Sequence, residues 1–397
     1  YMNTPISRFG SKCEVSDKVI NKLIKFGVVD SAISLTEIKD KKSAKKTDGR
    51  KTRNIRGIPK LIDANKAGTS KSGDCTLILC EGDSAKAGIV SGLSKEDRDY
   101  YGVFPLKGKL LNTLDAPQKK INDNVEITNI KKILGLETNK SYAELEIRKK
   151  SLRYGKVLIM TDQDLDGAHI KGLCINMFQS QWRELVKVSN FIGFMNTPIL
   201  KATKGKKVKS FYNEADYKKW KNKNNGGKGW KIKYYKGLGT STAKEFKEYF
   251  AQKKVVMFSH SGLTCDNAID KVFNKKRADD RKEWLGKYDR ESVLNVDESN
   301  IPYSDFVDME MIHFSKYDCE RSIPNAMDGL KISTRKILFA AKKRNLVNEI
   351  KVAQFAGYVS EHACYHHGEM SLNKAIIGLA QEYVGSNNIN ILMPNGQ

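Results

Sequence analysis

Two short apolar runs in the first half of the chain predict buried β-strands, at residues 76–80 and 157–160. A polar turn follows each run, and a helical pattern follows each turn. The first helical pattern begins at Ala85, and the second has apolar positions at Ile170, Leu173, Met177 and Leu185. A strand, a turn and a helix that recur along a chain indicate a parallel sheet in an α/β domain.

The rest of the pattern is helical near both ends of the chain. An amphipathic helix is expected at residues 15–26, and the remainder of residues 1–60, rich in Lys, Gly and Arg, is interpreted as a linker. Residues 224–227 form an expected surface loop. Further on, the pattern predicts charged helix and connector at 268–300, then helices that are clearest at 323–346 and 371–383.

Composition narrows the class of protein. A chain of 397 residues exceeds what one hydrophobic core usually organises, so two or three domains are expected. No apolar run approaches the roughly 20 residues of a membrane-spanning helix. The seven cysteines are scattered and none forms a C-x-x-C pair, which argues against a disulfide framework and favours a reducing compartment. The chain begins without Met or a secretory signal, and we expect a piece of a longer protein.

The charge points to a polyanionic partner. Seventy basic against 46 acidic side chains give a net charge of +24, and only 14 of the basic residues are Arg. A general bias toward Lys would spread this excess evenly. Instead, residues 201–240 hold 13 Lys, no Arg and two acids, a local excess of +11. Neutralisation of phosphates is the usual reason to tolerate such self-repulsion, so a nucleic-acid role is the leading interpretation.

Acidic residues gather where the two predicted strands end. Glu81 directly follows the first strand, and Asp162, Asp164 and Asp166 follow the second. Alternate side chains of an extended segment share one face, so the three aspartates could converge there. Neighbouring parallel strands would bring Glu81 to the same edge of the sheet. Such carboxylates repel one another unless a cation compensates, and oxygen-only ligands favour Mg²⁺.

Two other interpretations of this acidic segment differ in strength. A solvated acidic turn remains open, because Asp164 and Gly167 suit loop conformations. An EF-hand calcium loop fails, because Leu173 stands where the bidentate Glu is required.

Six motifs resemble one family, the type IIA DNA topoisomerases. Three of them resemble its Toprim domain: Glu81-Gly82-Asp83-Ser84-Ala85, residues 105–112 (from Pro105 to Asn112) and residues 161–167 (from Thr161 to Gly167). Residues 233–241 are similar to the DNA-contacting loop of the family, and residues 321–331 and 365–372 resemble the winged-helix part of its breakage–reunion domain. One chain that carries both halves resembles the enzymes of eukaryotes and large DNA viruses.

The resemblance implies the fold and four regions. The expected fold class is α/β, with a Toprim domain whose parallel sheet is flanked by helices, followed by a mainly helical winged-helix domain. Residues 1–74 would be a linker leading from an absent ATPase and transducer part. Residues 75–193 would be the metal-binding Toprim domain, and residues 194–315 its extension and connector with a Lys-rich DNA-contacting loop. Residues 316–397 would be part of the winged-helix domain, ending before the catalytic tyrosine.

The resemblance also implies the site. Glu81, Asp162 and Asp164 would hold Mg²⁺, in two sites and with Mn²⁺ or Ca²⁺ as substitutes, while Asp166 would have a supporting role. His366 and His367 would lie at the DNA phosphates near the catalytic tyrosine. The expected contacts to DNA are Lys109, Asn112, Tyr235, Lys236, Lys331, Tyr365 and Ser371. Ile332 stands where the family usually has Pro, which makes the Lys331 contact less secure.

The function implied is ATP-dependent passage of one duplex through a transient double-strand break, made through a 5′-phosphotyrosyl link and then religated. None of the 16 tyrosines matches the catalytic motif, so the nucleophile, its preceding arginine and the ATP site would belong to the full-length protein. The implied partners are duplex DNA and a second copy of the full-length protein, with no membrane. The location would be the nucleus for a cellular protein, or virion and host nucleus or cytoplasm for a viral one.

Two alternative functions are a non-catalytic scaffold that binds duplex DNA and a Toprim primase or nuclease. The motifs from Arg321 to Leu372 weaken the nuclease alternative, and the four intact acids weaken the scaffold alternative. Two site alternatives are weaker still. The segment from Gly237 to Ser241 lacks P-loop spacing, and a zinc site at His362, Cys364, His366 and His367 lacks a distant pair of ligands.

Overall fold

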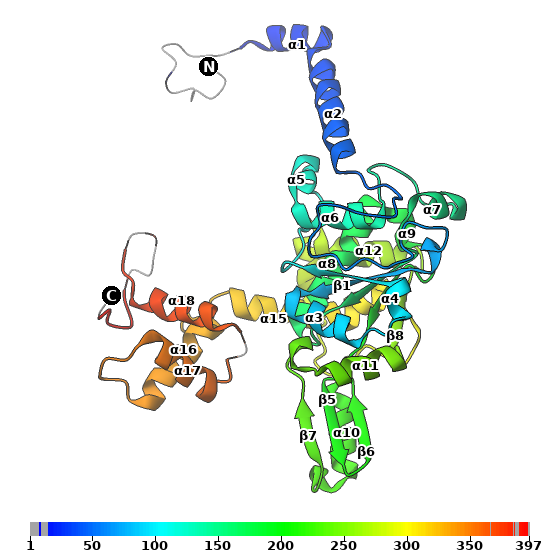
Figure 1. Ribbon diagram of the computed structural model, residues 1–397. Coiled ribbons are helices and arrows are strands. Elements are labelled where there is room, and N and C mark those ends of the chain that lie inside the picture. The colour runs from blue at the N-terminus through cyan, green and yellow to red at the C-terminus, as the bar shows by residue number, and fades with distance from the viewer. Residues whose placement is uncertain (1–7, 9–14, 366, 384, 386–388, 396–397) are drawn as a thin grey trace. The chain divides into compact units, whose positions relative to one another are not determined.

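A computed structural model (Figure 1) describes residues 8, 15–365, 367–383, 385 and 389–395. The chain divides into two compact units. Unit 1 comprises Tyr1–Arg281 and Val293–Glu310, and unit 2 comprises Lys282–Ser292 and Met311–Gln397. Within the described part of the chain, no helix is both long and apolar enough to cross a membrane.

The main sheet of unit 1 has six strands in the order β2-β1-β3-β4-β8-β9. The strands are β1 (Thr76–Glu81), β2 (Tyr101–Leu106), β3 (Lys156–Met160), β4 (Ile192–Met195), β8 (Val255–Ser259) and β9 (Asn300–Pro302). The first four run parallel, β8 is antiparallel to β4, and β9 is parallel to β8. The two apolar runs are therefore adjacent strands, and the predicted parallel α/β sheet is confirmed.

Helices cover both faces of this sheet. On one face α3 (Gly82–Gly92) packs against α11 (Ala243–Gln252), and their side chains join those of β1 and β3 in one core. A Cβ added to Gly88 would lie 2.3 Å from the Phe246 ring, so the two helices approach closely because this position has no side chain. The long helix α8 (Leu165–Gln181) and α12 (Leu263–Phe273) run along the other face (Figure 1).

Shorter helices complete unit 1. These are η2 (Ser72–Asp74), α4 (Asp97–Tyr100), α5 (Gln118–Asp123), α6 (Val125–Leu134), α7 (Leu145–Ser151), α9 (Arg183–Val186), α14 (Tyr303–Phe306) and a π-helical turn at Val307–Met311, whose last residue belongs to unit 2.

The expected linker near the N-terminus is instead largely helical. After α1 (Asp17–Lys25), which confirms the amphipathic helix, α2 runs from Val28 to Thr47. This second helix was not expected because the prediction weighed the Lys-rich composition, although no Gly or Pro interrupts this stretch and Lys and Ala are good helix formers. The role of the segment as a linker stays a prediction. Gly27, at φ 69°, makes the turn between the two helices.

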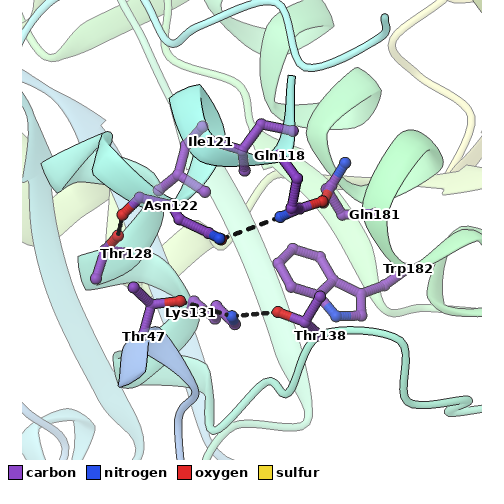
Figure 2. Close-up of a pocket in the computed structure, with 10 residues that line it drawn as sticks. Thr47, Gln118, Ile121, Asn122, Thr128, Lys131, Thr138, Gln181 and Trp182 are labelled. Atoms are coloured by element: carbon purple, nitrogen blue, oxygen red, sulfur yellow. Dashed lines mark hydrogen bonds between the residues drawn. The ribbon is translucent and has the colours of Figure 1, made fainter. Parts of the chain in front are cut away.

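The C-terminal end of α2 is held by a buried lysine on α6. Lys131 has a side chain that is 5% exposed, and its Nζ lies 2.6 Å from Asp48 Oδ1. The same ammonium group donates to Thr47 Oγ1, at 2.9 Å, and to Thr138 Oγ1 (Figure 2). The cavity beside it, of about 10 Å³, is at the lower limit for a single water molecule, so this is a structural joint and not a ligand pocket.

A small antiparallel sheet with one helix forms a lobe of unit 1. It consists of β5 (Leu200–Lys204), β6 (Lys207–Phe211), β7 (Lys231–Tyr234) and α10 (Glu214–Lys223), and η3 (Asn225–Gly227) lies in the predicted surface loop. Phe211 and Trp220 form its core with Leu200 and Ala202.

Glu245 on α11 anchors this lobe to the main sheet. Its carboxylate accepts a hydrogen bond from Lys233 Nζ at 2.8 Å, from the Tyr235 hydroxyl, and from the backbone N–H of Thr242 at 2.8 Å in a capping box. Burial disfavours ionisation of this group, but the hydrogen bonds from Lys233, Thr242 and Tyr235 outweigh it and lower the pKa of Glu245 to about 2.

Unit 2 is mainly helical. Its helices are α13 (Ala278–Gly286), which begins in unit 1, α15 (Ile312–Ser322), α16 (Ile332–Arg344), α17 (Val352–His362) and α18 (Glu369–Ala380). The last three pack around Ile337, Phe355, Val359 and Leu372. The helix expected from residue 323 begins only at Ile332, because Pro324 and Gly329, at φ 67°, hold the preceding residues in turns.

The joint at Lys131 gives a prediction for the variant Asp48→Ala. Removal of one partner leaves a buried ammonium group without its counter-charge, which costs about 3 kcal/mol. We therefore expect hydrogen exchange of the last two turns of α2 to accelerate roughly 100-fold. Asp30→Ala, in the exposed first turn of the same helix, is the matched control and should leave those amides unchanged. Equal exchange rates in both variants would show that the ion pair does not hold the helix.

The Glu245 anchor gives a prediction about pH. A carboxyl whose pKa is depressed from 4.5 to about 2 stabilises the fold fully above pH 4.5 and loses this contribution as the pH falls toward 2. The stability difference between the wild type and Glu245→Gln should therefore be constant down to about pH 5 and then shrink toward about pH 3. Fluorescence of Trp220 and Trp230, which lie in the lobe, measures it. A difference that grew on acidification would contradict the assignment.

Candidate metal and DNA site

Two carboxylates meet at the carboxyl edge of the main sheet. Cys80 of β1 and Met160 of β3 are register partners, so Glu81, the last residue of β1, and Asp162, two residues after Met160, lie at the same edge of the sheet. The backbone N–H of Asp162 donates to Glu81 Oε2 at 3.3 Å. The expectation that these two acids share one edge is confirmed, because their strands are direct neighbours.

The convergence of three aspartates through an extended segment is not what the structure shows. The extended backbone ends at Asp164, whose Oδ1 accepts a hydrogen bond from Gly167 N at 2.7 Å and caps α8. Asp166 therefore lies in the first helical turn, where its Oδ1 is 2.7 Å from Lys109 Nζ. Side chains alternate between two faces only along an extended backbone. Here the extended backbone ends at Asp164, because Asp is strongly preferred as the N-cap residue of a helix.

The electrostatics of this edge favour a cation. Burial, and then the charge of Asp162, raise the pKa of Glu81 to about 7, with further contributions from Asp164 and Asp166. Burial also raises the pKa of Asp162, although the hydrogen bond from Leu238 opposes this. Within the described ranges, no three acidic, His or Cys side chains are already arranged around one ion position. The fit to Mg²⁺ therefore rests on the donor chemistry: oxygen ligands whose mutual repulsion a divalent ion would relieve.

A loop that is distant in sequence closes over Asp162. The backbone N–H of Leu238 donates to Asp162 Oδ1 at 2.7 Å. A Cβ added to Gly237 would lie 2.2 Å from Asp162 Oδ2, so only glycine permits this approach. η4 (Leu238–Thr240) follows directly. The segment that resembles a DNA-contacting loop is thus bonded to a predicted metal ligand, a link that neither motif signals by itself.

Lys109 and Asn112 lie in the loop after β2. Lys109 faces Asp166, as described above. Asn112 uses both ends of its amide inside unit 1: its Nδ2 donates to Phe273 O at 2.8 Å, and its Oδ1 accepts from Asn176 Nδ2 at 2.8 Å. In this conformation Asn112 therefore ties the loop to α8 and α12.

Tyr235 and Lys236 are neighbours in sequence but differ in setting. Tyr235 is 5% exposed, and its hydroxyl is used by Glu245. Its side chain therefore supports the loop from inside and is not presented to a ligand. Lys236 is exposed, one residue before the glycine that abuts Asp162.

The remaining predicted residues belong to unit 2. Lys331 is the exposed N-cap residue of α16. Tyr365 is buried, and its hydroxyl donates to Ser371 Oγ, in the first turn of α18, at 3.3 Å. The Tyr365 ring meets the His367 ring edge to face, with centroids 5.4 Å apart. His366 lies outside the described residues.

Tyr317 is a further residue of this cluster that the motifs did not indicate. Its hydroxyl lies 2.7 Å from His367 Nε2, and the Arg321 guanidinium lies over its ring at 4.9 Å. A hydrogen bond to one imidazole nitrogen orients the ring and influences which nitrogen carries the proton. The only sequence signal was the spacing of Tyr317 and Arg321, which places them one helical turn apart on α15.

Three family models match consecutive parts of the chain. The Toprim domain matches residues 76–194, the C-terminal associated domain of TOPRIM matches residues 195–319, and the model for the A subunit of DNA gyrase/topoisomerase IV matches residues 321–397. Together they cover the described sheet edge, the lobe and the helices of unit 2.

Curated relatives match over the whole chain. DNA topoisomerase 2 of Plasmodium falciparum is 50% identical, and that of Bombyx mori and the 2-alpha protein of Rattus norvegicus are each 49% identical. In all three, 100% of this chain is covered, but only 28%, 26% and 27% of the relatives' own length. The chain thus spans about a quarter of the proteins it matches.

A solved structure matches as well. The crystal structure of the Plasmodium falciparum topoisomerase II DNA-binding, cleavage and re-ligation domain is 53% identical, with a TM-score of 0.76 over 87% of this chain and 47% of that one. The fold class expected from the sequence is confirmed. Motifs, family models, relatives and fold agree, and the chain belongs to the type IIA DNA topoisomerase family, of which it carries the Toprim region and part of the region that resembles the gyrase A protein.

Proposed function

We propose that this chain is the metal-binding and DNA-contacting part of an ATP-dependent type II DNA topoisomerase. The whole enzyme would cleave both strands of a duplex through a 5′-phosphotyrosyl link, pass a second duplex and religate. The observation that carries the proposal is the contact between the loop at Gly237 and the acid Asp162, because it joins a DNA-contacting motif to a metal-binding motif.

Glu81, Asp162 and Asp164 would hold Mg²⁺, with Asp166 in support. Toprim domains generally depend on Mg²⁺, and two such ions, replaceable by Mn²⁺ or Ca²⁺, are proposed here. A divalent ion bound at this edge would stabilise the negative charge that develops on the 3′ oxygen as the strand breaks. The proposed supporting role of Asp166 agrees with its pairing to Lys109, which neutralises its charge.

The other residues would position the DNA. Lys236 and Lys331 are exposed cations suited to phosphate contacts, which orient a duplex without reading its sequence. His367, held by Tyr317, would donate to the DNA backbone near the catalytic tyrosine, and His366 is proposed for the same role. Tyr365 and Ser371 would shape this surface.

The partners and the location follow from the same proposal. Duplex DNA is the proposed substrate, and a homodimer is the proposed assembly of the full-length protein. The catalytic tyrosine, its preceding arginine and the ATP site would lie in other parts of that protein. A cellular enzyme of this kind would act in the nucleus.

The first test is Asp162→Asn in the complete protein. Asparagine keeps an oxygen that can accept the Leu238 hydrogen bond, so the loop should stay in place while the negative charge is lost. We expect DNA binding to persist and Mg²⁺-dependent cleavage to fall by about 100-fold or more, as when one electrostatic stabiliser is removed. Asp97→Asn, which removes an acid just before β2 and thus at the opposite edge of the sheet, is the control and should cleave normally.

The readout of this test is the amount of covalent protein–DNA adduct. Adduct at wild-type level in Asp162→Asn would refute the metal assignment. If the wild-type protein itself formed no adduct while binding duplex DNA, the chain would belong to a non-catalytic scaffold.

The second test compares Gly237→Ala with Gly239→Ala in the same loop. A methyl group at residue 237 would collide with the Asp162 carboxylate, whereas nothing lies within 4 Å of one at residue 239. Neither residue has a positive φ, so only the steric effect differs. For Gly237→Ala we expect the Mg²⁺ concentration at half-maximal cleavage to rise by about 10- to 100-fold, and Mn²⁺ affinity measured by EPR to fall in parallel. Equal behaviour of the two variants would mean that the loop does not support the metal site.

A further inference from the structure

The lobe of β5, β6, β7 and α10 presents an unusual surface. Residues 201–236, which comprise this lobe and the first two residues after β7, hold 13 lysines, and two of them are structural: Lys201 pairs with Glu248 at 2.9 Å, and Lys233 pairs with Glu245 at 2.8 Å. The other lysines are exposed and have no ion-pair partner among the residues that the structure describes. They are Lys204, Lys206, Lys207, Lys209, Lys218, Lys219, Lys221, Lys223, Lys228, Lys231 and Lys236.

The strands hold like charges in direct opposition. Lys204 and Lys207 are register partners at the turn between β5 and β6, an arrangement that destabilises a sheet. Lys204 also extends beside Gly229, since its Nζ lies 3.8 Å from where a Cβ of that glycine would be. The turn is therefore adjacent to the loop that carries Lys228. Among the residues that the structure describes, no acid forms an ion pair with Lys204 or Lys207, and a surface that tolerates such repulsion is expected to meet a polyanion.

Ordinary explanations account for only part of this charge. The helix dipole favours Lys221 and Lys223 in the last turn of α10, and Glu214 and Asp216 in its first. The helix dipole does not account for the lysines on β6 or for those in the turn between β5 and β6. A general bias toward Lys does not account for them either, because such a bias would be even along the chain, whereas residues 201–240 hold 13 Lys, no Arg and only two acids.

The lobe is continuous with the site at Asp162. β7 leads through Tyr235 and Lys236 to the loop whose amide bonds that carboxylate. At about 3.3 Å per residue, Lys231 lies up to roughly 16 Å along the chain from Lys236, the length of about five base pairs. A duplex held at the acids therefore has phosphates within reach of the lobe.

We propose that this lobe binds the phosphate backbone of duplex DNA outside the base pairs that are cleaved. The proposal rests on the function proposed above and adds a second, sequence-independent contact that lengthens the footprint of the protein on DNA. Lysine acts on phosphate as a point charge on a flexible stem, so such a contact tolerates any sequence. The two anchoring lysines hold the lobe in place and take no part in binding.

The test neutralises four lysines of the lobe and four elsewhere. The lobe variant carries Lys204→Gln, Lys206→Gln, Lys207→Gln and Lys209→Gln. The control has the same charge change on α1 and α2, where four lysines are exposed and unpaired within the described residues: Lys18→Gln, Lys22→Gln, Lys25→Gln and Lys39→Gln. Both are made in this 397-residue chain and assayed without metal, so that the assay measures DNA binding alone and does not depend on the proposed metal site. Circular dichroism and Trp fluorescence confirm that each variant is folded.

The measured quantities are the affinities for duplexes of about 15 and about 40 base pairs as a function of salt. We expect the lobe variant to lose about 10-fold or more in affinity for the longer duplex, with little loss for the shorter one. The slope of log affinity against log salt should fall by up to about 3.6, which is about 0.9 for each phosphate that the four lysines no longer neutralise. The control should stay within about twofold of the wild type, because α1 and α2 carry charge without the opposed lysines. A second lobe variant, with Gln at Lys218, Lys219, Lys221 and Lys223, should show the same length dependence.

Three outcomes would overturn the proposal. Equal losses in the lobe and control variants would mean that only net charge matters. Equal losses for both duplex lengths would place the lysines at the cleaved base pairs. Loss of binding to poly-glutamate with DNA binding intact would indicate an acidic protein as the partner. Cleavage by Asp162→Asn decides the proposed function separately, because this binding assay contains no metal.

Discussion

The parallel pairing of β1 with β3 fixes two carboxylates close together at one edge of the sheet. Glu81 and Asp162 leave adjacent strands at the same edge, and burial prevents water from screening their repulsion. Asp164 and Asp166 add to this negative charge, whereas the backbone N–H of Leu238 and the N-terminus of α8 offset part of it. A site built in this way keeps an energetic demand for a cation while its scaffold stays rigid, because the strands and not the loops determine where the acids lie.

The same edge connects the Toprim sheet to the lobe. α11 shares a core with α3 and, through Glu245, holds Lys233 and Tyr235 at the base of β7. Tyr235 therefore contributes to the site from inside the protein, through its hydrogen bond to Glu245. Because Tyr235 is held in this way, it positions the exposed Lys236 that follows it. The residues that touch a ligand and the residues that orient them are consecutive in the chain, which explains why one short motif can carry both tasks.

Much of this architecture could be predicted from the sequence, because the strands are continuous apolar runs and the acids follow them directly. The failures have separate physical causes. The Lys-rich composition concealed α2, whose anchorage depends on Lys131, far away in sequence. The helix N-cap at Asp164 ended the extended geometry that would have aligned Asp166. The burial of Tyr235 and the contact of Tyr317 with His367 depend on tertiary packing, and local patterns do not encode it.

The joint at Lys131 also has a mechanical consequence. α2 is 20 residues long, and at 1.5 Å per residue it is a rod of about 30 Å. Its contacts with α6 are concentrated at one end, at Thr47 and Asp48. A rod held in this way acts as a lever: a rotation of about 10° at the held end displaces the far end by about 5 Å, given the helical rise. A small rotation of α2 about its held end therefore becomes a large displacement at Gly27. Conversely, a displacement of Gly27 produces a smaller movement, but a larger force, at the end of α2 that contacts α6.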